Sequence, residues 1–501
     1  MDFIVNSIIA TITNPLSMVM VLAGTFMGLV FGALPGLTAT MAVALLIPMT
    51  FTLEPVAAIG TMLGAYVGGM SGGAISACLL NIPGTPSAVV TTMDGYPMAK
   101  SGRGAEALGW AAFASGFGSL ISWVVLVSLS PLLAKVCTSF SAPEYAALAI
   151  FGLTIISAVS GKSISKGLIA GLIGMTLALA GTDPIWGDMR FTFGNFNLFS
   201  GVATMPALIG LYSIPQILNG CIEKNTVKNV KVKMKNFVPS PKKLWKAKVN
   251  ILRTSLIGTI IGIIPATGGN IAAFMAYDQA KRFSKDPESF GKGNPEGIVA
   301  SEAANNAVCG GALIPMLTLG IPGDSITAVL LGGLMIHGLT PGPALFTEHY
   351  DIIIGIFTTM LIATIMMVIL QMVGIRIFVK VLSVPVNFLS AALVILALVG
   401  SYALRANMFD VFLTIGLGIF GYFLMRGGFP VAPAVLGLVL GRMFEREFRT
   451  ALRTSNNDLS VFVTRPIACA FLIVALIVII SAGIKRYRAN KSKGNDESVT
   501  I

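Results

Sequence analysis

The chain has 501 residues, of which 55% are hydrophobic and only 11% are charged. With a mean hydropathy of +0.84, this composition excludes an ordinary soluble domain and a disordered chain, and it predicts a helical protein that crosses a membrane many times. The formal net charge of +12 does not indicate nucleic-acid binding, because the lysines gather in one internal loop and at the C-terminus, where they signal membrane topology.

Apolar segments of spanning or almost spanning length fill the first half of the chain. In chain order they are predicted at residues 9–31, 35–51, 56–80, 106–134, 145–160, 164–181 and 201–221. A polar, lysine-rich stretch at 222–250 follows them. Because loops rich in lysine stay on the cytoplasmic side, this stretch is predicted to be a basic cytoplasmic linker.

A second series of apolar segments begins after the linker. Its members are predicted at residues 251–266, 267–280, 298–320, 352–375, 386–404, 408–425 and 430–445, with a separate final span at 466–484. Several arginines over 442–455 favour an amphipathic segment at the membrane surface. The basic residues after the final span predict a cytoplasmic C-terminus. Because the N-terminus lacks the features of a cleaved signal peptide, the first apolar segment is expected to be retained.

The two series resemble two copies of one unit. The matching motifs are Gly32-Ala-Leu-Pro35 with Gly262-Ile-Ile-Pro265, and Ile82-Pro-Gly84 with Ile321-Pro-Gly323. A third match joins Ala146-Ala-Leu148 to Ala391-Ala-Leu393. The weakest joins 206–210 to 433–437, and it requires residues 182–200 to be an insertion in the first copy. Short insertions into an ancient duplication explain why the offset between the copies drifts along the chain.

The charges indicate that the two copies are inverted. The connection after the first Ile-Pro-Gly motif carries Lys100 and Arg103, whereas its counterpart carries Glu348 and Asp351. Basic connections mark the cytoplasmic side, so this connection changes sides between the copies. The predicted fold is an all-α polytopic membrane protein with two inverted-topology repeats, broken or re-entrant helices, and one extra C-terminal transmembrane helix. The predicted divisions are 1–221 for repeat 1, 222–250 for the linker, 251–455 for repeat 2, and 456–501 for the C-terminal helix and tail.

Glycine and proline recur inside apolar sequence at four places, which are the two pairs of matching motifs. Proline removes a backbone donor and glycine permits unusual dihedrals, so helices should break there. One such pair predicts only a kink, but four duplicated breaks followed by hydroxyl, amide or carboxyl side chains favour a binding site for a polar ligand. The residues predicted to bind it are Gly36, Thr38, Thr40, Ser71, Asn81, Gly84, Thr85, Ser87, Thr267, Gly268, Asn270, Gly323, Ser325 and Thr327.

A coupling cation is predicted beside the same breaks, held by Asn305, Asn306 and Asp324 with nearby carbonyl groups. Two plainer interpretations stay open. Asp324 could cap a helix, and Glu302 with the two asparagines could make hydrogen bonds between helices. No metal other than a sodium ion is expected, and the scattered cysteines predict packing residues.

An intramembrane aspartyl hydrolase is a competing prediction, because Asp278 and Asp324 could share a proton. It is disfavoured by the lack of acidic residues at the matching positions of the first copy, which are Pro48 and Thr85. No phosphate-binding loop of the Gly-x-x-x-x-Gly-Lys-Ser/Thr type is present, so transport would depend on an ion gradient.

Five motifs carry a resemblance to a known family. They are 32–40, Leu80-Asn-Ile-Pro-Gly-Thr-Pro86, Asp94-Gly-Tyr-Pro97, Gly320-Ile-Pro-Gly-Asp324 and His337-Gly-Leu-x-Pro-Gly-Pro343. In this order they resemble the large membrane subunit of the bacterial tripartite tricarboxylate transporters, from about residue 15 to 455. The resemblance implies a non-enzymatic, multi-pass permease of the bacterial inner membrane, surrounded by lipids and working with a small membrane subunit and a periplasmic solute-binding protein. It further implies uptake of citrate or another carboxylate, driven by sodium or protons and without a cofactor. A stand-alone ion-coupled symporter or channel is the alternative.

Overall fold

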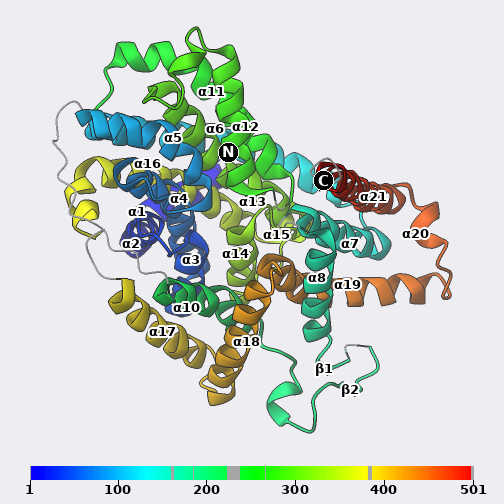
Figure 1. Cartoon of the computed structure of the whole chain (residues 1–501). Coiled ribbons are helices and arrows are strands. Elements are labelled where there is room, and N and C mark those ends of the chain that lie inside the picture. The colour runs from blue at the N-terminus through cyan, green and yellow to red at the C-terminus, as the bar shows by residue number, and fades with distance from the viewer. Residues whose placement is uncertain are drawn as a thin grey trace. The chain divides into compact units, whose positions relative to one another are not determined.

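The computed structural model describes residues 2–159, 163–183, 185–222, 237–265, 267–381 and 386–497. These residues are almost entirely helical (Figure 1). Within them the only strands are a short antiparallel pair, β1 (Gly181–Thr182) and β2 (Met189–Arg190), with Gly181 paired with Arg190. The prediction of an all-α protein is confirmed.

Five helical stretches among the described residues are long and apolar enough to cross a membrane. They are α2 (Pro15–Ala33), α4 (Pro55–Leu80), the run Pro86–Cys137 that contains α5 (Val89–Met98) and α6 (Gly104–Cys137), the part Tyr350–Gly374 of α16 (Tyr350–Val381), and α18 (Met408–Arg426). Shorter apolar helices account for several of the other predicted segments. The chain is therefore a multi-pass membrane protein.

The described residues divide into two compact units, and each unit takes residues from both halves of the sequence. Unit 1 is Met1–Cys137 with Met205–Tyr422, and unit 2 is Thr138–Thr204 with Phe423–Ile501. The division of the chain into consecutive repeats at 1–221 and 251–455 therefore stays a prediction. Of the predicted linker, residues 223–236 lie outside the described residues, and its last part already belongs to α11 (Pro241–Ile263).

Unit 1 contains most of the apolar helices. Besides α2, α4, α5, α6, α11, α16 and α18, its helices are α1 (Asp2–Thr13), α3 (Ala39–Thr50), α9 (Thr204–Leu208), α10 (Ile214–Ile222), α12 (Gly268–Phe283), α13 (Pro295–Leu319), α14 (Ser325–Ile336), α15 (Pro343–Glu348) and α17 (Val386–Ala403). Helix α13 is buried along almost its whole length.

The helices break at both Ile-Pro-Gly motifs, as predicted. Helix α4 ends at Leu80, followed by Asn81 in the left-handed conformation with φ 58°. Helix α13 ends before Gly320, whose φ is 70°. The chain is then irregular until a short 3₁₀ turn at Pro86–Ala88 in the first case and until α14 in the second. A residue with positive φ is a common way to end a helix, and the proline that follows prevents its continuation.

The earlier pair of motifs also separates helices. Helix α2 gives way to α3 after Gly36, whose φ is 89°, and α11 gives way to α12 at Gly268, whose φ is 64°. Both bends therefore depend on a residue that tolerates left-handed backbone. All four predicted breaks are present.

Glycines let the helices of unit 1 approach very closely, and the contacts recur in the two halves. A Cβ atom added at Gly28 would lie 2.7 Å from Cα of Ala65, and one added at Gly258 would lie 2.7 Å from Cα of Ala304. One turn later, a Cβ at Gly32 would lie 3.1 Å from Cα of Gly72. Its counterpart at Gly262 would lie 3.0 Å from Cα of Gly311. Helix α2 thus packs on α4 as α11 packs on α13, through small residues typical of membrane helices.

Unit 2 is built by helices from distant parts of the chain. They are α7 (Ala142–Val159), α8 (Ile164–Ala178), α19 (Val431–Thr454), α20 (Val461–Thr464) and α21 (Pro466–Glu497). Helix α19 packs against α8, because a Cβ at Gly437 would lie 2.9 Å from the nitrogen of Met175. In unit 1 the corresponding contact joins Gly210 to α18, where the Cβ would lie 3.3 Å from the nitrogen of Gly418.

The predicted surface segment 442–455 is not a separate element. Helix α19 continues without interruption through these residues, because no glycine or proline stands between Gly441 and Thr454. The predicted end of the span at residue 445 lies inside this helix, and an amphipathic surface segment over 442–455 stays a prediction. The side chains of the last predicted span are described only in part, and whether α21 spans the membrane stays a prediction.

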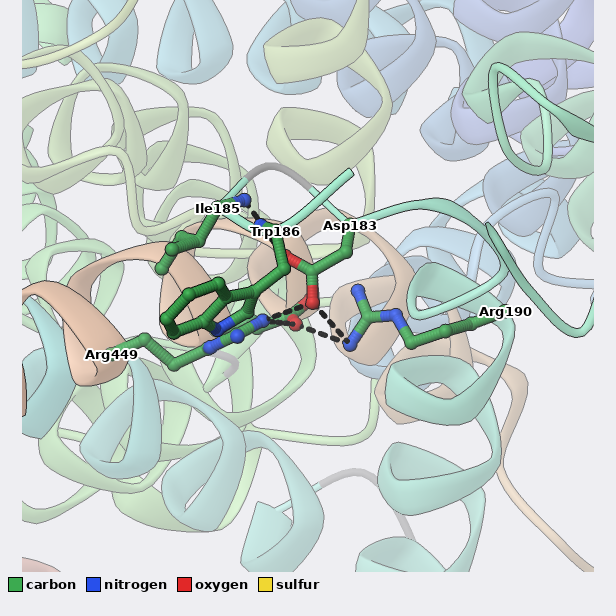
Figure 2. A network of polar contacts seen from close by, with 6 residues as sticks. Asp183, Ile185, Trp186, Arg190 and Arg449 are labelled. Atoms are coloured by element: carbon green, nitrogen blue, oxygen red, sulfur yellow. Dashed lines mark hydrogen bonds and ion pairs between the residues drawn. The ribbon is translucent and has the colours of Figure 1, made fainter. Parts of the chain in front are cut away.

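An arginine and a glutamate of α19 form ion pairs with the loop that contains β1 and β2 in unit 2. Figure 2 shows Asp183 between the guanidinium groups of Arg449, at 2.5 Å, and Arg190, at 3.7 Å. Glu445 accepts from Arg190 at 2.6 Å, and Asp183 also accepts from the backbone of Ile185. The hydrogen bond from Arg449 holds the pKa of Asp183 well below its ordinary value. Residues 182–200, the predicted insertion, are thus tied to α19 by ion pairs.

Candidate functional site

The second Ile-Pro-Gly break ends in a charged helix cap. Oδ1 of Asp324 accepts from the backbone nitrogens of Ile326, at 3.1 Å, and Thr327, at 2.8 Å. The Thr327 hydroxyl in turn accepts from the Asp324 nitrogen at 2.9 Å, which completes a capping box. Oδ2 accepts from the Tyr66 hydroxyl of α4 at 2.6 Å. This geometry agrees with helix capping, which is one of the two interpretations left open for Asp324.

Two helix N-termini meet at this break. The Thr40 hydroxyl, in the first turn of α3, lies 3.2 Å from the hydroxyl of Ser325, the first residue of α14. Thr38 caps α3 by accepting from the Met41 nitrogen, and its hydroxyl donates to Gln216 at 2.6 Å. Helix N-termini carry partial positive charge, so two of them together favour an anion. We call Thr38, Thr40, Tyr66, Asp324, Ser325 and Thr327 the Thr40 cluster.

The first Ile-Pro-Gly break forms a second polar cluster. The hydroxyls of Thr85 and Ser87 lie 3.2 Å apart, and both residues are buried. A Cβ added at Gly269, in the first turn of α12, would lie 3.2 Å from Cβ of Ser87 and 2.5 Å from Oδ1 of Asn305. The break in the first half therefore meets the N-terminus of α12 from the second half. We call Thr85, Ser87, Gly268, Gly269 and Asn305 the Ser87 cluster.

In each cluster, the start of a helix from one half of the chain meets an Ile-Pro-Gly break from the other half. In the Thr40 cluster, the start of α3 meets the later break of the second half. In the Ser87 cluster, the start of α12 meets the later break of the first half. Helices α4 and α13 lie between the clusters, because Asn305 of α13 donates to the Met70 carbonyl of α4 at 2.9 Å and Cys309 lies next to Tyr66.

Two buried amide oxygens in this region lack a hydrogen-bond partner among the described residues. They are Oδ1 of Asn305 and Oδ1 of Asn306, and both residues are at most 1% exposed. The Asn306 nitrogen donates to the Val67 carbonyl and to the Ser119 hydroxyl, each at 3.3 Å. Buried polar atoms are normally satisfied. Unsatisfied amide oxygens have the chemistry of ligands for a hard cation.

The glycines predicted to present backbone amides are also packing residues. A Cβ at Gly84 would overlap the Gly32 carbonyl oxygen, and one at Gly323 would lie 2.6 Å from Cα of Ala312 and from the Gly262 carbonyl oxygen. Neither the Gly84 nor the Gly323 nitrogen donates a hydrogen bond to any residue that the structure describes. Donors left open at a helix break are what an anionic ligand needs.

Other predicted residues do not join either cluster. Ser71 is buried and accepts from Gln371 of α16 at 2.5 Å. Asn81 is an exposed helix C-cap, and Asn270 is exposed on α12. The Thr267 hydroxyl donates to the carbonyls of Ile261 and Ile264, which fixes the bend before α12.

Several polar residues of the site were missed by the sequence analysis. Tyr66, Gln216 and Gln371 all bind predicted site residues from other helices. A signal was available, because each is a polar side chain inside an apolar segment, where polar groups carry a cost and tend to have partners. Their partners could not be named without the fold.

The two aspartates of the hydrolase hypothesis have different partners. Asp278 is exposed and pairs with Arg282 at 2.7 Å. Asp324 is buried and bound by Tyr66 and backbone nitrogens. Since neither carboxylate binds the other, the structure offers no shared-proton pair here.

A basic cavity of about 710 Å³ lies elsewhere in unit 1, between α11, α12 and the start of α13. Lys246, Arg253, Lys285 and Lys292 line it, together with the acids Asp286 and Glu296. None of the predicted site residues lines this cavity.

The chain is similar to known proteins along most of its length. The sequence profile described as the tripartite tricarboxylate transporter TctA family matches residues 18–436. A protein of Agrobacterium vitis, described as an uncharacterised 52.8 kDa protein in the TAR-I ttuC' 3' region, is 36% identical over 496 residues, covering 98% of this chain and 99% of its own length. A second protein of Agrobacterium vitis, from the TAR-II ttuC' 3' region, is 39% identical over 236 residues, covering 47% of this chain and 98% of its own length. No solved structure matches the chain.

Proposed function

The chain belongs to the tripartite tricarboxylate transporter TctA family, and on this premise we propose that it is the permease of a binding-protein-dependent secondary transporter. The permease imports a carboxylated solute, such as citrate or another carboxylate, across the bacterial inner membrane. A small membrane subunit and a periplasmic solute-binding protein are its partners. A sodium or proton gradient drives the uptake, and residues 222–250 and the C-terminus face the cytoplasm.

The observation that carries this proposal is the meeting of broken helices from both halves. Helix N-termini come together at the Thr40 and Ser87 clusters, and the Gly84 and Gly323 nitrogens have no partner among the described residues. Open N–H groups and helix dipoles both favour an anion. A carboxylate solute fits these clusters, since they contain hydroxyl and amide donors in the interior of a membrane protein.

The repeated contacts support the proposal of two inverted repeats. Gly28 and Gly258 make equivalent approaches to α4 and α13, and the contact of Gly437 with α8 has a counterpart in the contact of Gly210 with α18. The last of these involves the weakest sequence match, 206–210 with 433–437. In inverted-repeat transporters the solute site lies between the repeats, near the middle of the bilayer.

Reconstitution tests the proposal. Proteoliposomes with this chain, the small membrane subunit and the binding protein should accumulate labelled citrate, or another carboxylate bound by that binding protein, when a sodium or proton gradient is imposed. Liposomes with this chain alone should show little uptake. Uptake by this chain alone, at the full rate, would instead identify a stand-alone symporter or channel.

One side chain makes this test specific to the site. Ser325→Ala removes the hydroxyl that meets Thr40, and we expect the KM for solute to rise about 2- to 10-fold, which corresponds to one hydrogen bond. Ser128→Ala is the matched control, because the Ser128 hydroxyl donates only to the carbonyl one turn earlier in α6. An equal effect of both substitutions would argue against a solute site at the Thr40 cluster.

A further inference from the structure

Glu302 of α13 is an acid in the interior of unit 1 whose direct partners are neutral. Its side chain is 0% exposed. One carboxylate oxygen accepts from the Thr91 hydroxyl of α5, and the other accepts from the Ser115 hydroxyl of α6 at 3.1 Å. Thr91 is also 3.0 Å from the Ser301 hydroxyl. Among the described residues, no lysine, arginine or histidine pairs with Glu302.

A buried carboxylate without a counter-charge is unstable. Moving an ionised carboxylate out of water is energetically costly, and the cost is largest when no positive charge accompanies it. Several other buried acids have such a partner, and the two described ones that lack it, Asp94 and Asp324, accept from backbone N–H groups instead. Glu106 is 7% exposed and binds Arg103 and Lys243, each at 2.9 Å. Asp410 is fully buried and binds Arg405 at 2.5 Å. Glu302 therefore needs a positive charge that the described chain does not supply.

The hydrogen-bond partners of Glu302 can bind its carboxyl group in both the ionised and the neutralised state. A hydroxyl can donate to an ionised carboxylate, and it can rotate to accept from a protonated one. Asp324 differs, because two of its partners are backbone N–H groups that can only donate. Backbone donors of this kind cannot turn to accept from a protonated carboxyl group. The hydroxyl partners of Glu302 can therefore bind both a charged and a neutralised carboxyl group, whereas the backbone donors of Asp324 can bind only an accepting oxygen.

The two unsatisfied amide oxygens lie on the same helix, within the next turn. Asn305 and Asn306 follow Glu302 by three and four positions, so all three share one side of α13. Ser115 and Ser119, which bind Glu302 and Asn306, are likewise one turn apart on α6. Oδ1 of Asn305 faces the Ser87 cluster at Gly269. A polar strip thus leads from Glu302 to the break that the proposed function assigns to the solute.

The titratable and charged groups on the surrounding helices are neutral thiols and phenols or have partners of their own. On α4 the facing group is the thiol of Cys78, and α12 carries Tyr277, whose hydroxyl donates to Asp94. Asp94 on α5 accepts from Tyr277 at 2.7 Å and from the backbone nitrogens of 291, 293 and 294. On α11, Arg253 donates to Asn250 at 3.3 Å. Glu106 on α6 and Asp324 before α14 bind the partners already described.

We propose that Glu302 is the charged group of the coupling site and takes up the monovalent cation that drives transport, assisted by the oxygens of Asn305 and Asn306. This inference rests on the proposed function and moves the charge of the coupling site from Asp324 to Glu302. A proton would neutralise the carboxyl group itself. A sodium ion would be held between the carboxylate, the hydroxyls and the amide oxygens. In either case the ionised Glu302 binds one cation on one side of the membrane, releases it on the other, and is then ionised again.

The test separates driven uptake from exchange. In proteoliposomes with both partner subunits, Glu302→Gln should reduce gradient-driven accumulation at least tenfold, while exchange of internal for external labelled solute continues. The measured quantity is the ratio of driven uptake to exchange. Glu106→Gln is the matched control, because it neutralises another buried glutamate that has cationic partners, and its ratio should equal that of the wild type.

Two gradient arms identify the cation. Uptake is measured against sodium concentration at fixed pH, and against pH without sodium. Glu302→Gln should abolish whichever dependence the wild type shows. Glu302→Asp keeps a carboxylate, so it should restore cation dependence with a half-saturation point shifted at least threefold. This second variant also covers the case in which Glu302→Gln fails to fold.

The outcomes separate a failure of the proposed function from a failure of the assignment to Glu302. If the wild type shows no uptake with its partners, the proposed function fails. If the wild type takes up solute and both Glu302 variants keep its cation dependence and its ratio of driven uptake to exchange, the assignment to Glu302 is wrong and the proposed function stands.

Discussion

The two Ile-Pro-Gly breaks share their packing but differ in their chemistry. At the first break Gly84 lies against Gly32, near the end of α2. At the second break Gly323 lies against Gly262, near the end of α11. The later break contains a carboxylate bound by Tyr66 and by its own helix, whereas the earlier one has only the hydroxyls of Thr85 and Ser87. The two breaks therefore have similar glycine packing, but only the later one is capped by a carboxylate.

The glycines at the two breaks should give the largest effects. Gly84→Ala would force a methyl group onto a backbone carbonyl oxygen, and Gly323→Ala would place one 2.6 Å from Cα of Ala312. Overpacking of this kind costs about 1–3 kcal/mol or more. We expect both variants to lower the yield of folded protein and the Tm in detergent, with Gly84→Ala the more severe.

Gly416→Ala is the control for this pair, because nothing lies within 4 Å of an added Cβ at that position of α18. It should leave the Tm unchanged or raise it slightly, since alanine favours a helix. If Gly84→Ala behaves like Gly416→Ala, the close packing at the first break is wrong. We also expect Gly84→Val and Gly323→Val to lose uptake without losing membrane insertion, and both quantities are measured for each variant.

Removing the carboxylate should separate the two breaks. Asp324→Ala deletes a helix cap, at a cost of about 1–2 kcal/mol, and it leaves the buried Tyr66 hydroxyl without its acceptor, at about 1–3 kcal/mol. Thr85→Ala deletes one hydroxyl contact and should cost only about 1 kcal/mol. Thermal unfolding of the purified variants measures the difference. Equal losses would mean that the second break does not depend on the Asp324 cap.

Asp324→Asn sharpens that result, because asparagine is also a good N-cap and can still accept from Tyr66. We expect it to retain most of the stability that Asp324→Ala loses. A loss as large as that of alanine would show that the negative charge itself, rather than the cap, stabilises the break.

The ion pairs of unit 2 lie away from both breaks, and removing one of them should have the smallest effect on stability. Asp183→Asn removes the carboxylate that Arg449 and Arg190 bind. Because these partners lower the pKa of Asp183, its stabilising contribution is present above the ordinary aspartate pKa of about 4 and is lost as the pH falls below it. The variant should therefore have a lower Tm than the wild type at pH 7, and the difference should shrink below about pH 4. A difference that does not change with pH would contradict the ion pair.

The sequence predicted the breaks well because they depend on local chemistry. At each of the four breaks a proline lies within three residues of a residue with positive φ, and this local combination ends the helix, whereas the prolines inside α3, α6 and α13 do not. The partners of the side chains could not be found in this way. Ser71 binds Gln371 and Thr38 binds Gln216 across long stretches of chain, and periodicity does not specify such pairs. Asn81 and Thr267 follow the same breaks but satisfy backbone needs instead.

The division into units was beyond reach for the same reason. Chain order places α7 and α8 with the first repeat, yet in the structure they pack with α19. The contacting glycines, such as Gly174 and Gly437, look like any other small residues of an apolar segment. Only their pairing in space reveals the exchange between the halves.

That exchange has a consequence for biosynthesis. When the ribosome has completed α8, the helix that will cover it has not yet been translated, and α10 likewise waits for α18. Newly inserted helices of the first half must therefore persist in the lipid with unmatched glycine faces until the nascent chain is almost finished. Folding of the first half should therefore be complete only after the C-terminal helices are synthesised. Until then the incomplete chain would be exposed to membrane chaperones and proteases.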